Sequence, residues 1–452
     1  MREEVEIEPL TRVEGHGKVR IFIQKGRVER VQLSIFESPR FFEKFLEGIP
    51  AEEAPRITGR ICGICYVAHD LASVKAVEDA WNVKPPEAAV KLRRLLHMGG
   101  YISSHTLHLV FLAVPDLLDV PQRDFRGLNT AKPALLNNAV RLREVGLEVT
   151  KVIGGRVIHP VAVVPGGMAK PLTEESRLKL LDAMQNALPL SKEISDLLFE
   201  IAESKREVME EYPRFATHYI GLTNNGLHEI YDGEVSVMSP QGKVETEFHP
   251  REYLQYIIEE TMPHSYVKYP YVKLSSIDKG MYRVGALARL NVADDFSPPL
   301  ASELLDRYRG IFGRPAHSVA AYNLARSIEL VHVTELAIEI LRDKDITSDT
   351  TRTPVTPIEG TGVGVVEAPR GVLIHHYETD AKGYIRRANL IVATGHNIPA
   401  LEESIMDTAT KFIPKVDRER ALWILEKVVR AYDPCISCAT HMVEIVENNE
   451  YR

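Results

Sequence analysis

The sequence contains few cysteines and no segment that resembles an export signal or a membrane span. Four cysteines in 452 residues are too few for a disulfide framework. No stretch approaches the roughly 20 consecutive apolar residues of a membrane helix, and the first residues contain no apolar signal segment. We therefore expect a cytoplasmic protein with no direct membrane span, although export with a signal-bearing partner is compatible with the sequence.

The usual signs of nucleic-acid and nucleotide binding are also missing. The formal net charge is −8 and there is no long basic run, so we expect no nucleic acid as a partner. The glycines at 154–155 and 166–167 form neither a GxGxxG motif nor a Walker loop. Nothing in the chain therefore predicts a nucleotide site.

Apolar periodicity, in contrast, is abundant. Hydrophobic residues make up 44% of the chain, enough for one large body with a deep core. The pattern predicts an α+β fold, predominantly α, in which a long central helix bundle carries small antiparallel sheets near the N-terminus and late in the chain. Separate helices are predicted near 86–97 and 102–114. The predicted parts of the body 1–452 are a β-rich part (1–60), a helical core (61–212 and 316–343), a strand-rich insertion (213–290), a C-terminal part (351–441) and an extension (442–452).

All four cysteines lie in two CxxC pairs, Cys62 with Cys65 and Cys435 with Cys438. We expect them to form one four-thiolate site that the C-terminal part closes. Zinc ribbons place their pairs roughly 15–20 residues apart, whereas these pairs are 370 positions apart. A thioredoxin-like redox pair would leave the other two cysteines unexplained. The arrangement favours a catalytic metal centre over either alternative.

Five motifs occur in order along the chain: TRVEGH at 11–16, RFFEKFLEG at 40–48, RICGIC at 60–65 followed by His69, EAPRG at 367–371 and DPCISCATH at 433–441. They resemble the large subunit of [NiFe]-hydrogenases over nearly the whole chain, from residue 11 to residue 441. The compact length and the segment HTLHL at 105–109 resemble the cytosolic multisubunit branch of that family.

The resemblance implies a nickel–iron centre on the four cysteines. Cys62 and Cys435 would be terminal nickel thiolates, while Cys65 and Cys438 would bridge nickel to an iron that carries cyanide and carbon monoxide. Cys435 would be the first base. Glu14 would take the proton from the Cys435 sulfur.

Further residues would surround this centre by the same resemblance. Arg370 would lie over the metals in a pocket that Pro369 helps to shape, held by Asp433 and Asp116. For Asp116, a simple helix-terminal role is an equally good interpretation. His69 would donate a hydrogen bond to a cysteine sulfur, with a packed core histidine as the alternative.

A second ion, magnesium or Fe²⁺, would lie near the C-terminus. Glu43 and His441 would bind it, together with backbone near residues 390–392. Mature large subunits end at the position of His441, so residues 442–452 would be an extension that a maturation protease removes. The alternative is that this branch of the family keeps its tail.

The implied function is reversible cleavage of H₂ to protons and electrons. With no cysteines left for an iron–sulfur cluster in this chain, an iron–sulfur small subunit would accept the electrons. Further expected partners are electron-transfer subunits of flavin and NAD(P), F420 or heterodisulfide reductase type, and nickel-insertion factors. The alternative is a non-enzymatic metal protein, either an H₂-sensing homologue or a structural four-cysteine zinc subunit of a redox complex.

Overall fold

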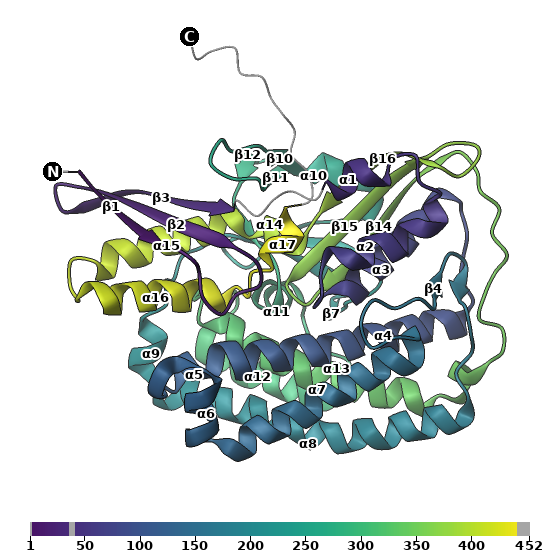
Figure 1. The fold of residues 1–452 in the computed structure, drawn as a ribbon, viewed down its shortest axis with the longest axis horizontal. Helices are drawn as coiled ribbons and strands as arrows, with labels where there is room; N and C mark the ends of the chain where they lie inside the picture. The colour runs from purple at the N-terminus through teal and green to yellow at the C-terminus, as the bar shows by residue number, and fades with distance from the viewer. Residues whose placement is uncertain (1, 36–40, 441–452) are drawn as a thin grey trace, which may run out of the picture.

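A computed structural model of the chain describes residues 2–35 and 41–440. It is 51% helical with small sheets, which confirms the predicted α+β, predominantly α class. Helices form the lower half of the view in Figure 1 and the sheets lie above them. The main helices of the bundle are α4 (Glu87–Thr106), α7 (Pro133–Gly154), α8 (Glu174–Ser204), α12 (Pro299–Phe312) and α13 (Ala321–Arg342).

Two glycines let helices α4 and α7 cross closely. A Cβ atom on Gly99 would lie 2.9 Å from Gly146 O, and one on Gly146 would lie 2.7 Å from Gly99 O. The predicted break between residues 97 and 102 is therefore wrong, because these glycines serve helix packing and do not end the helix. Helix α4 continues into a π-helical segment (Leu107–Ala113) and then α5 (Val114–Leu117).

The N-terminal strands form the predicted small antiparallel sheet, a meander of three strands. Alternate residues of β2 are buried, and the sheet packs on the C-terminal helix α15. The last long helix, α16, leads into the second cysteine pair (Figure 1). The elements are β1 (Arg2–Ile7), β2 (Gly17–Gln24), β3 (Arg27–Ile35), α15 (Ile398–Phe412) and α16 (Arg418–Ala431).

Residues 213–290 are rich in strands, as predicted. They form a five-stranded sheet and a three-stranded one, and all strand pairs are antiparallel except β13 with β6. The strands are β6 (His218–Asn224), β7 (Leu227–His228), β8 (Glu234–Met238), β9 (Val244–Phe248), β10 (Ile257–Glu260), β11 (Tyr269–Leu274), β12 (Ile277–Gly280) and β13 (Tyr282–Arg283).

The late sheet supports the helix that follows the first cysteine pair. Strand β14 (Gly360–Ala368) presents Gly360, Gly362 and Gly364 to α3 (Tyr66–Ala80), and a Cβ on Gly364 would lie 1.9 Å from Ala72 O. Helix and strand backbones therefore touch directly. This contact fixes α3 relative to β14. The sheet is completed by β15 (Gly371–Thr379) and β16 (Ile385–Ile391).

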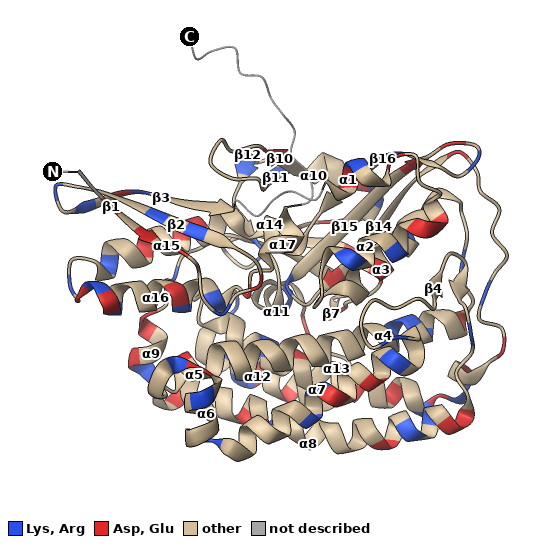
Figure 2. Ribbon diagram, in the orientation of Figure 1, with Lys and Arg blue, Asp and Glu red and all other residues tan. Residues whose placement is uncertain are grey.

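Short helices and bridges connect these elements. Within the described residues, no helix is both long and apolar enough to cross a membrane. Figure 2 shows Lys and Arg interspersed with Asp and Glu over helices and loops. The short elements are α1 (Phe42–Leu46), α2 (Ala54–Thr58), α6 (Phe125–Ala131), β4 (Val163–Val164), β5 (Gly167–Met168), α9 (Arg206–Glu210), α10 (Tyr253–Tyr256), α11 (Ala286–Val292), α14 (Ala393–His396) and α17 (Ile436–Ala439).

Candidate metal centre

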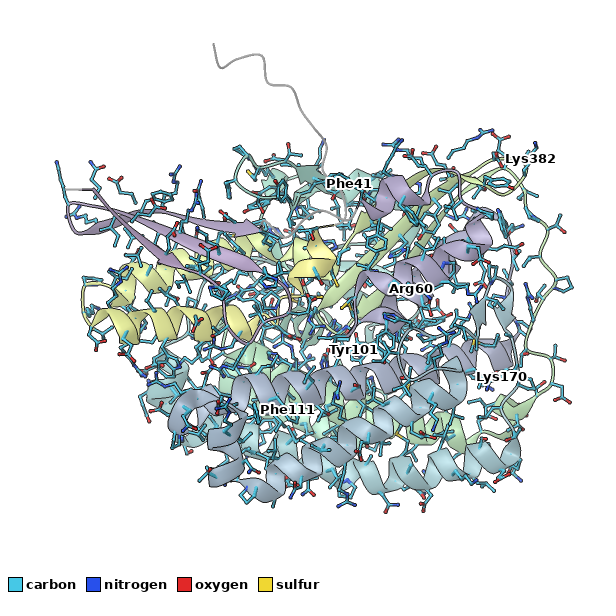
Figure 3. All side chains as sticks on the ribbon, in the orientation of Figure 1. Phe41, Arg60, Tyr101, Phe111, Lys170 and Lys382 are labelled. Atoms are coloured by element: carbon cyan, nitrogen blue, oxygen red, sulfur yellow. The ribbon has the colours of Figure 1, made fainter. Side chains whose placement is uncertain are left out.

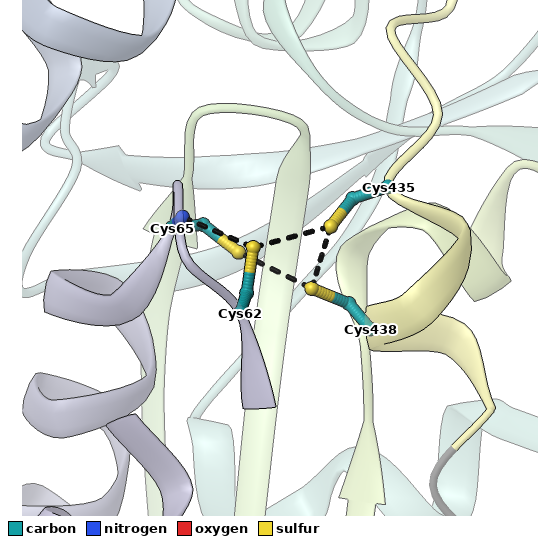
Figure 4. A group of neighbouring side chains, drawn as sticks. All are labelled: Cys62, Cys65, Cys435 and Cys438. Carbon is teal, nitrogen blue, oxygen red and sulfur yellow. Dashed lines mark hydrogen bonds between the residues drawn. The ribbon is translucent and has the colours of Figure 1, made fainter. Parts of the chain in front are cut away.

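The two cysteine pairs converge in one buried cluster (Figure 4). Cys65 immediately precedes α3, and Cys435 immediately precedes the four-residue helix α17 that carries Cys438. The Sγ distances are 3.3 Å from Cys62 to Cys435, 3.4 Å from Cys65 to Cys438, and 2.6 Å from Cys435 to Cys438. Among the described residues, this is the one group of three or more His, Cys, Asp or Glu side chains close enough to hold a metal ion.

The sulfurs differ in their surroundings. The backbone N–H groups of Ile64 and Cys65 lie 3.2 and 3.3 Å from Cys62 Sγ, and donors of this kind stabilise a thiolate. Hydrogen bonds from Cys435 and Cys438 hold the pKa of Cys62 well below its usual range. Burial raises the pKa of the Cys435 and Cys438 thiols. Four thiolates here thus require cations close by.

Glu14 reaches the cluster from the other end of the chain. Its Oε2 lies 3.1 Å from Cys435 Sγ and accepts a hydrogen bond of 3.1 Å from the Ser437 N–H. The Ser437 hydroxyl donates to Oε1, and the Glu14 carbonyl accepts from the Ile436 N–H at 2.9 Å. The predicted proximity of Glu14 to Cys435 is therefore present in the structure, through both side chain and backbone.

Arg370 and Asp433 form a buried ion pair beside the cluster. Arg370 Nε donates to the Asp433 carbonyl at 2.7 Å and Nη2 donates to Oδ1 at 3.0 Å. Burial opposes the charge on Arg370, but Asp433 and the neighbouring cysteine sulfurs raise its pKa well above the usual value. Burial likewise opposes ionisation of Asp433, but Arg370 and His108 lower its pKa. The expected contact between Asp433 and Arg370 is present in the structure, and both shifts favour the charged forms of the pair.

The predicted contact of Asp116 with Arg370 is wrong. Asp116 Oδ2 accepts from Arg430 Nε at 2.7 Å, and Oδ1 accepts from Trp423 Nε1 at 3.2 Å and from Arg12 Nη2. The reason is geometric, because the π-helical segment and α5 direct Asp116 toward α16. Asp116 instead connects α16 to Arg12, in the loop that carries Glu14.

His69 is fully buried one turn after Cys65. Its Nδ1 lies 3.2 Å from His375 Nε2, and His375 Nδ1 lies 2.7 Å from the Tyr377 hydroxyl. No sequence motif indicated this chain of contacts. The expected hydrogen bond from His69 to a cysteine sulfur stays a prediction.

Three other residues near the site, Thr394, His108 and Ser437, were not among the predicted site residues. Thr394 Oγ1 accepts the Cys435 N–H at 2.9 Å, and His108 Nδ1 lies 3.1 Å from Asp433 Oδ1. Ser437 could have been noticed, since it lies between the two cysteines of its CxxC pair. Thr394 gives no signal in the sequence, and His108 resembles any core histidine.

The second predicted ion site is only partly within the described residues. Glu43 is buried and its Oε1 accepts the Leu390 N–H at 2.6 Å, which brings it to the predicted 390–392 segment. His441 and residues 442–452 lie outside the described residues. Pro369 lies in the turn between β14 and β15, directly before Arg370.

The donor groups fit a bound metal group. Four soft sulfur ligands converge in a buried site, a set that suits nickel, iron and zinc. Arg370 Nη1 is buried and has no hydrogen-bond partner among the described residues, so an anionic ligand of a bound metal could accept its N–H. The four sulfur ligands by themselves suit nickel, iron and zinc equally.

Comparison with known proteins distinguishes between these metals. A sequence model described as "Nickel-dependent hydrogenase" matches residues 40–133 and 219–441, and one described as "HoxL-like" matches residues 4–38. The first match covers more than half of the chain. The chain belongs to the nickel-dependent hydrogenase family.

Its relatives match over almost their full lengths. The F420-non-reducing hydrogenase vhu of Methanocaldococcus jannaschii has a subunit that is 47% identical over 409 residues, covering 89% of this chain and 98% of the relative. NAD-reducing hydrogenase HoxS subunit beta of Cupriavidus necator is 35% identical over 467 residues, covering 98% and 95%. A crystal structure of an NAD⁺-reducing [NiFe]-hydrogenase in the H₂-reduced state has a TM-score of 0.93 at 37% identity, covering 97% of this chain and 99% of that one.

These relatives confirm the resemblance and the fold predicted from the five motifs. The four-cysteine cluster of this nickel-dependent hydrogenase lies where the paired motifs meet. The alternative of a structural zinc subunit is not favoured.

Proposed function

We propose that this nickel-dependent hydrogenase is a catalytic large subunit that interconverts H₂ with two protons and two electrons. The observation that carries the proposal is Glu14 Oε2 at 3.1 Å from Cys435 Sγ, within the four-sulfur cluster. A carboxylate beside a thiolate adds negative charge to a structural zinc site without a benefit. A proton acceptor at hydrogen-bond distance from a sulfur is what proton transfer requires.

The four sulfurs would hold a nickel–iron centre, with Cys62 and Cys435 on nickel and Cys65 and Cys438 shared between nickel and iron. When bound, such a centre supplies the heterolytic cleavage of H₂. Cyanide and carbon monoxide on the iron belong to the same proposal. Arg370 Nη1 supports it, because this buried N–H nitrogen has no partner among the described residues and cyanide is a suitable acceptor.

This chain's residues would handle the proton in two steps. Cys435 Sγ holds it first, and Glu14 Oε2 then receives it across 3.1 Å. Ser437 fixes the carboxylate through its N–H and its hydroxyl, so little reorganisation precedes transfer. Glu14 is only partly buried, and its proton can pass outward from there.

Arg370 would provide a fixed positive charge beside the thiolates. Its guanidinium is held by Asp433 and stays protonated, because arginine does not lose its proton in proteins. In a site that excludes water, such a charge acts more strongly than at the surface. Pro369 would help to fix the turn from which Arg370 extends.

Transfer of electrons away from the metal centre requires partner subunits. All four cysteines lie in the cluster, so we propose that the first acceptor is an iron–sulfur small subunit. Relatives named as F420-non-reducing and NAD-reducing hydrogenase subunits support a heteromultimer with further electron-transfer subunits. Cytoplasmic location, nickel-insertion factors and a maturation protease acting on residues 442–452 are part of this proposal.

We also propose a magnesium or Fe²⁺ ion near Glu43. Glu43 is buried and close to the Leu390 backbone, and oxygen ligands suit such an ion. His441 would complete the site by resemblance.

Elemental analysis and infrared spectroscopy of the purified complex would test the function. We expect nickel and iron, cyanide and carbonyl stretching bands, and H₂-dependent dye reduction. Zinc in stoichiometric amount without nickel would indicate a structural role. Nickel and iron with the infrared bands but without turnover would indicate an H₂ sensor.

A further inference from the structure

The backbone directly before Arg370 is hydrogen-bonded to the helical core. Arg289, on α11, donates from Nη1 to Ala368 O at 3.1 Å and from Nη2 to Pro369 O at 3.2 Å. The Tyr101 hydroxyl lies 3.0 Å from Glu367 O and 3.1 Å from Ala368 O. Tyr101 lies in the interior on α4, labelled in Figure 3. The carbonyl oxygens of three consecutive residues, 367–369, thus accept hydrogen bonds from Tyr101 or Arg289, or from both.

Arg289 is itself fixed by two carboxylates. Its Nε and Nη2 contact both oxygens of Glu329, with Nη2 to Oε2 at 2.7 Å. Its Nη1 donates to Glu367 Oε2 at 2.6 Å. Together with the two carbonyls, these contacts use all five N–H groups of the guanidinium. Lysine, with three donors on a single nitrogen, cannot reproduce this set.

Two histidines complete the support of Glu329. His105 Nε2 lies 2.9 Å from Oε2, and His228 Nε2 lies 3.1 Å from Oε1. Burial lowers the pKa of His105 to about 4, so this ring is neutral at pH 7 and its Nε2 carries the donated proton. Arg289 and its two carboxylate partners are fully buried. The cluster is therefore shielded from water.

The other side of the Arg370 turn packs against the start of the same helix. Gly285 has φ +90°, and a Cβ there would lie 2.8 Å from Arg370 O. On Gly371, a Cβ would lie 2.2 Å from Val284 Cγ2. Segment 284–285 and Arg289 thus hold the turn on two sides.

We propose that Arg289 is a positioning residue for the metal centre, which rests on the function proposed above. Asp433 fixes the guanidinium of Arg370, and Arg289 fixes the backbone from which that side chain extends. With both ends held, Arg370 Nη1 keeps one position relative to the cysteine sulfurs. A shift of about 1 Å in such a group can lower turnover about 100-fold.

Arg93 offers a matched control. It is also fully buried, binds both oxygens of Glu78 at 2.6 and 2.8 Å, and donates to two carbonyls, Val164 O and Gly167 O, at 3.0 and 2.9 Å. None of these contacts involves the turn at 367–371. The same Arg→Lys change at both positions therefore separates positioning from the general effect of altering a buried arginine.

The experiment compares Arg289→Lys and Arg93→Lys in the purified complex. For Arg289→Lys we expect kcat per bound nickel to fall about 100-fold, with shifted cyanide bands and faster hydrogen exchange in peptides covering 366–372. For Arg93→Lys we expect unchanged kcat per nickel, and faster exchange confined to peptides around 163–168. Tyr101→Phe, which removes one hydroxyl, should show the Arg289→Lys pattern to a smaller degree even if Arg289→Lys fails to assemble.

Equal kcat per nickel in wild type, Arg289→Lys and Tyr101→Phe would overturn the proposal. So would unchanged exchange at 366–372 in both variants. Failure of the proposed function looks different, because the wild-type complex would then lack nickel or H₂ turnover. In that case the exchange comparison still decides whether Arg289 fixes the turn.

Discussion

The two cysteine pairs occupy the same cluster but are held in different ways. Cys62 and Cys65 precede α3, a 15-residue helix whose backbone touches β14 at three glycines. Cys435 directly precedes a four-residue helix, α17, and Cys438 lies within it. That short helix is held by contacts from distant segments, namely the Glu14 loop and Thr394. Both pairs are buried in the core. The first is attached to a long helix that packs on a sheet, whereas the second also depends on hydrogen bonds from Glu14 and Thr394.

This difference indicates where the site can be changed without unfolding the protein. Changes around α3 should act on stability, because they disturb backbone packing. Changes to the hydrogen bonds at the start of α17 should act on the metal centre and on proton transfer, because these bonds hold Cys435 beside Glu14.

Replacing a cysteine of the second pair should have the largest effect. For Cys435→Ser we expect loss of nickel and of H₂ oxidation, since an alcohol is a poor replacement for a soft thiolate ligand. Exchange protection of α3 should stay unchanged. Metal analysis, dye reduction and hydrogen exchange check these points, with Cys62→Ser as the matched variant. Retained activity in Cys435→Ser would remove Cys435 from the ligand set.

Removing the charge of Glu14 should have the second-largest effect on turnover. Glu14→Gln keeps the shape and an acceptor for Ser437, but it cannot take a proton, so we expect a loss of about 1,000-fold in turnover with nickel retained. Glu8→Gln is a suitable control, because Glu8 is exposed and pairs with Lys18. Undiminished proton exchange with H₂ in Glu14→Gln would exclude Glu14 as the relay.

A side-chain carbon added where β14 contacts α3 should lower the free energy of unfolding. In Gly364→Ala the new Cβ meets Ala72 O at 1.9 Å, and overpacking of this kind costs about 2 kcal/mol. Gly310→Ala, where the Cβ meets nothing within 4 Å, should leave the unfolding midpoint equal or higher. Denaturant unfolding of both variants tests this contrast. A Gly364→Ala midpoint equal to wild type would mean that α3 is not held by this contact.

The smallest effect is expected at Thr394. Thr394→Val removes the acceptor of the Cys435 N–H and should cost about 1 kcal/mol, seen as faster hydrogen exchange over 433–439. Thr408→Val changes a buried threonine whose hydroxyl bonds within its own helix, to Ser404 O, and should leave that segment unaffected. Equal exchange in the two variants would show that α17 does not depend on Thr394.

The sequence predicted what depends on local pattern and on motif. Strand alternation indicated the small sheets near the N-terminus and late in the chain, and the CxxC spacing indicated the cluster of Cys62 with Cys435. The sequence pattern could not predict that Gly99 lies inside a helix, because a glycine that permits close helix packing cannot be told from one that ends a helix. The partner of Asp116 was missed because Arg430 is 314 positions away. Arg289 gave no signal, since its five contacts exist only after folding.

The bridge between Glu14 and Cys435 also orders events during biosynthesis. These residues are 421 positions apart, so the ribosome must finish almost the whole chain before the cluster can close. Cys62 is translated 373 residues before Cys435, an interval on the order of tens of seconds at ordinary rates of elongation. During that time half of the ligands exist without the other half. Metal delivery to the complete site must therefore follow translation of both cysteine pairs.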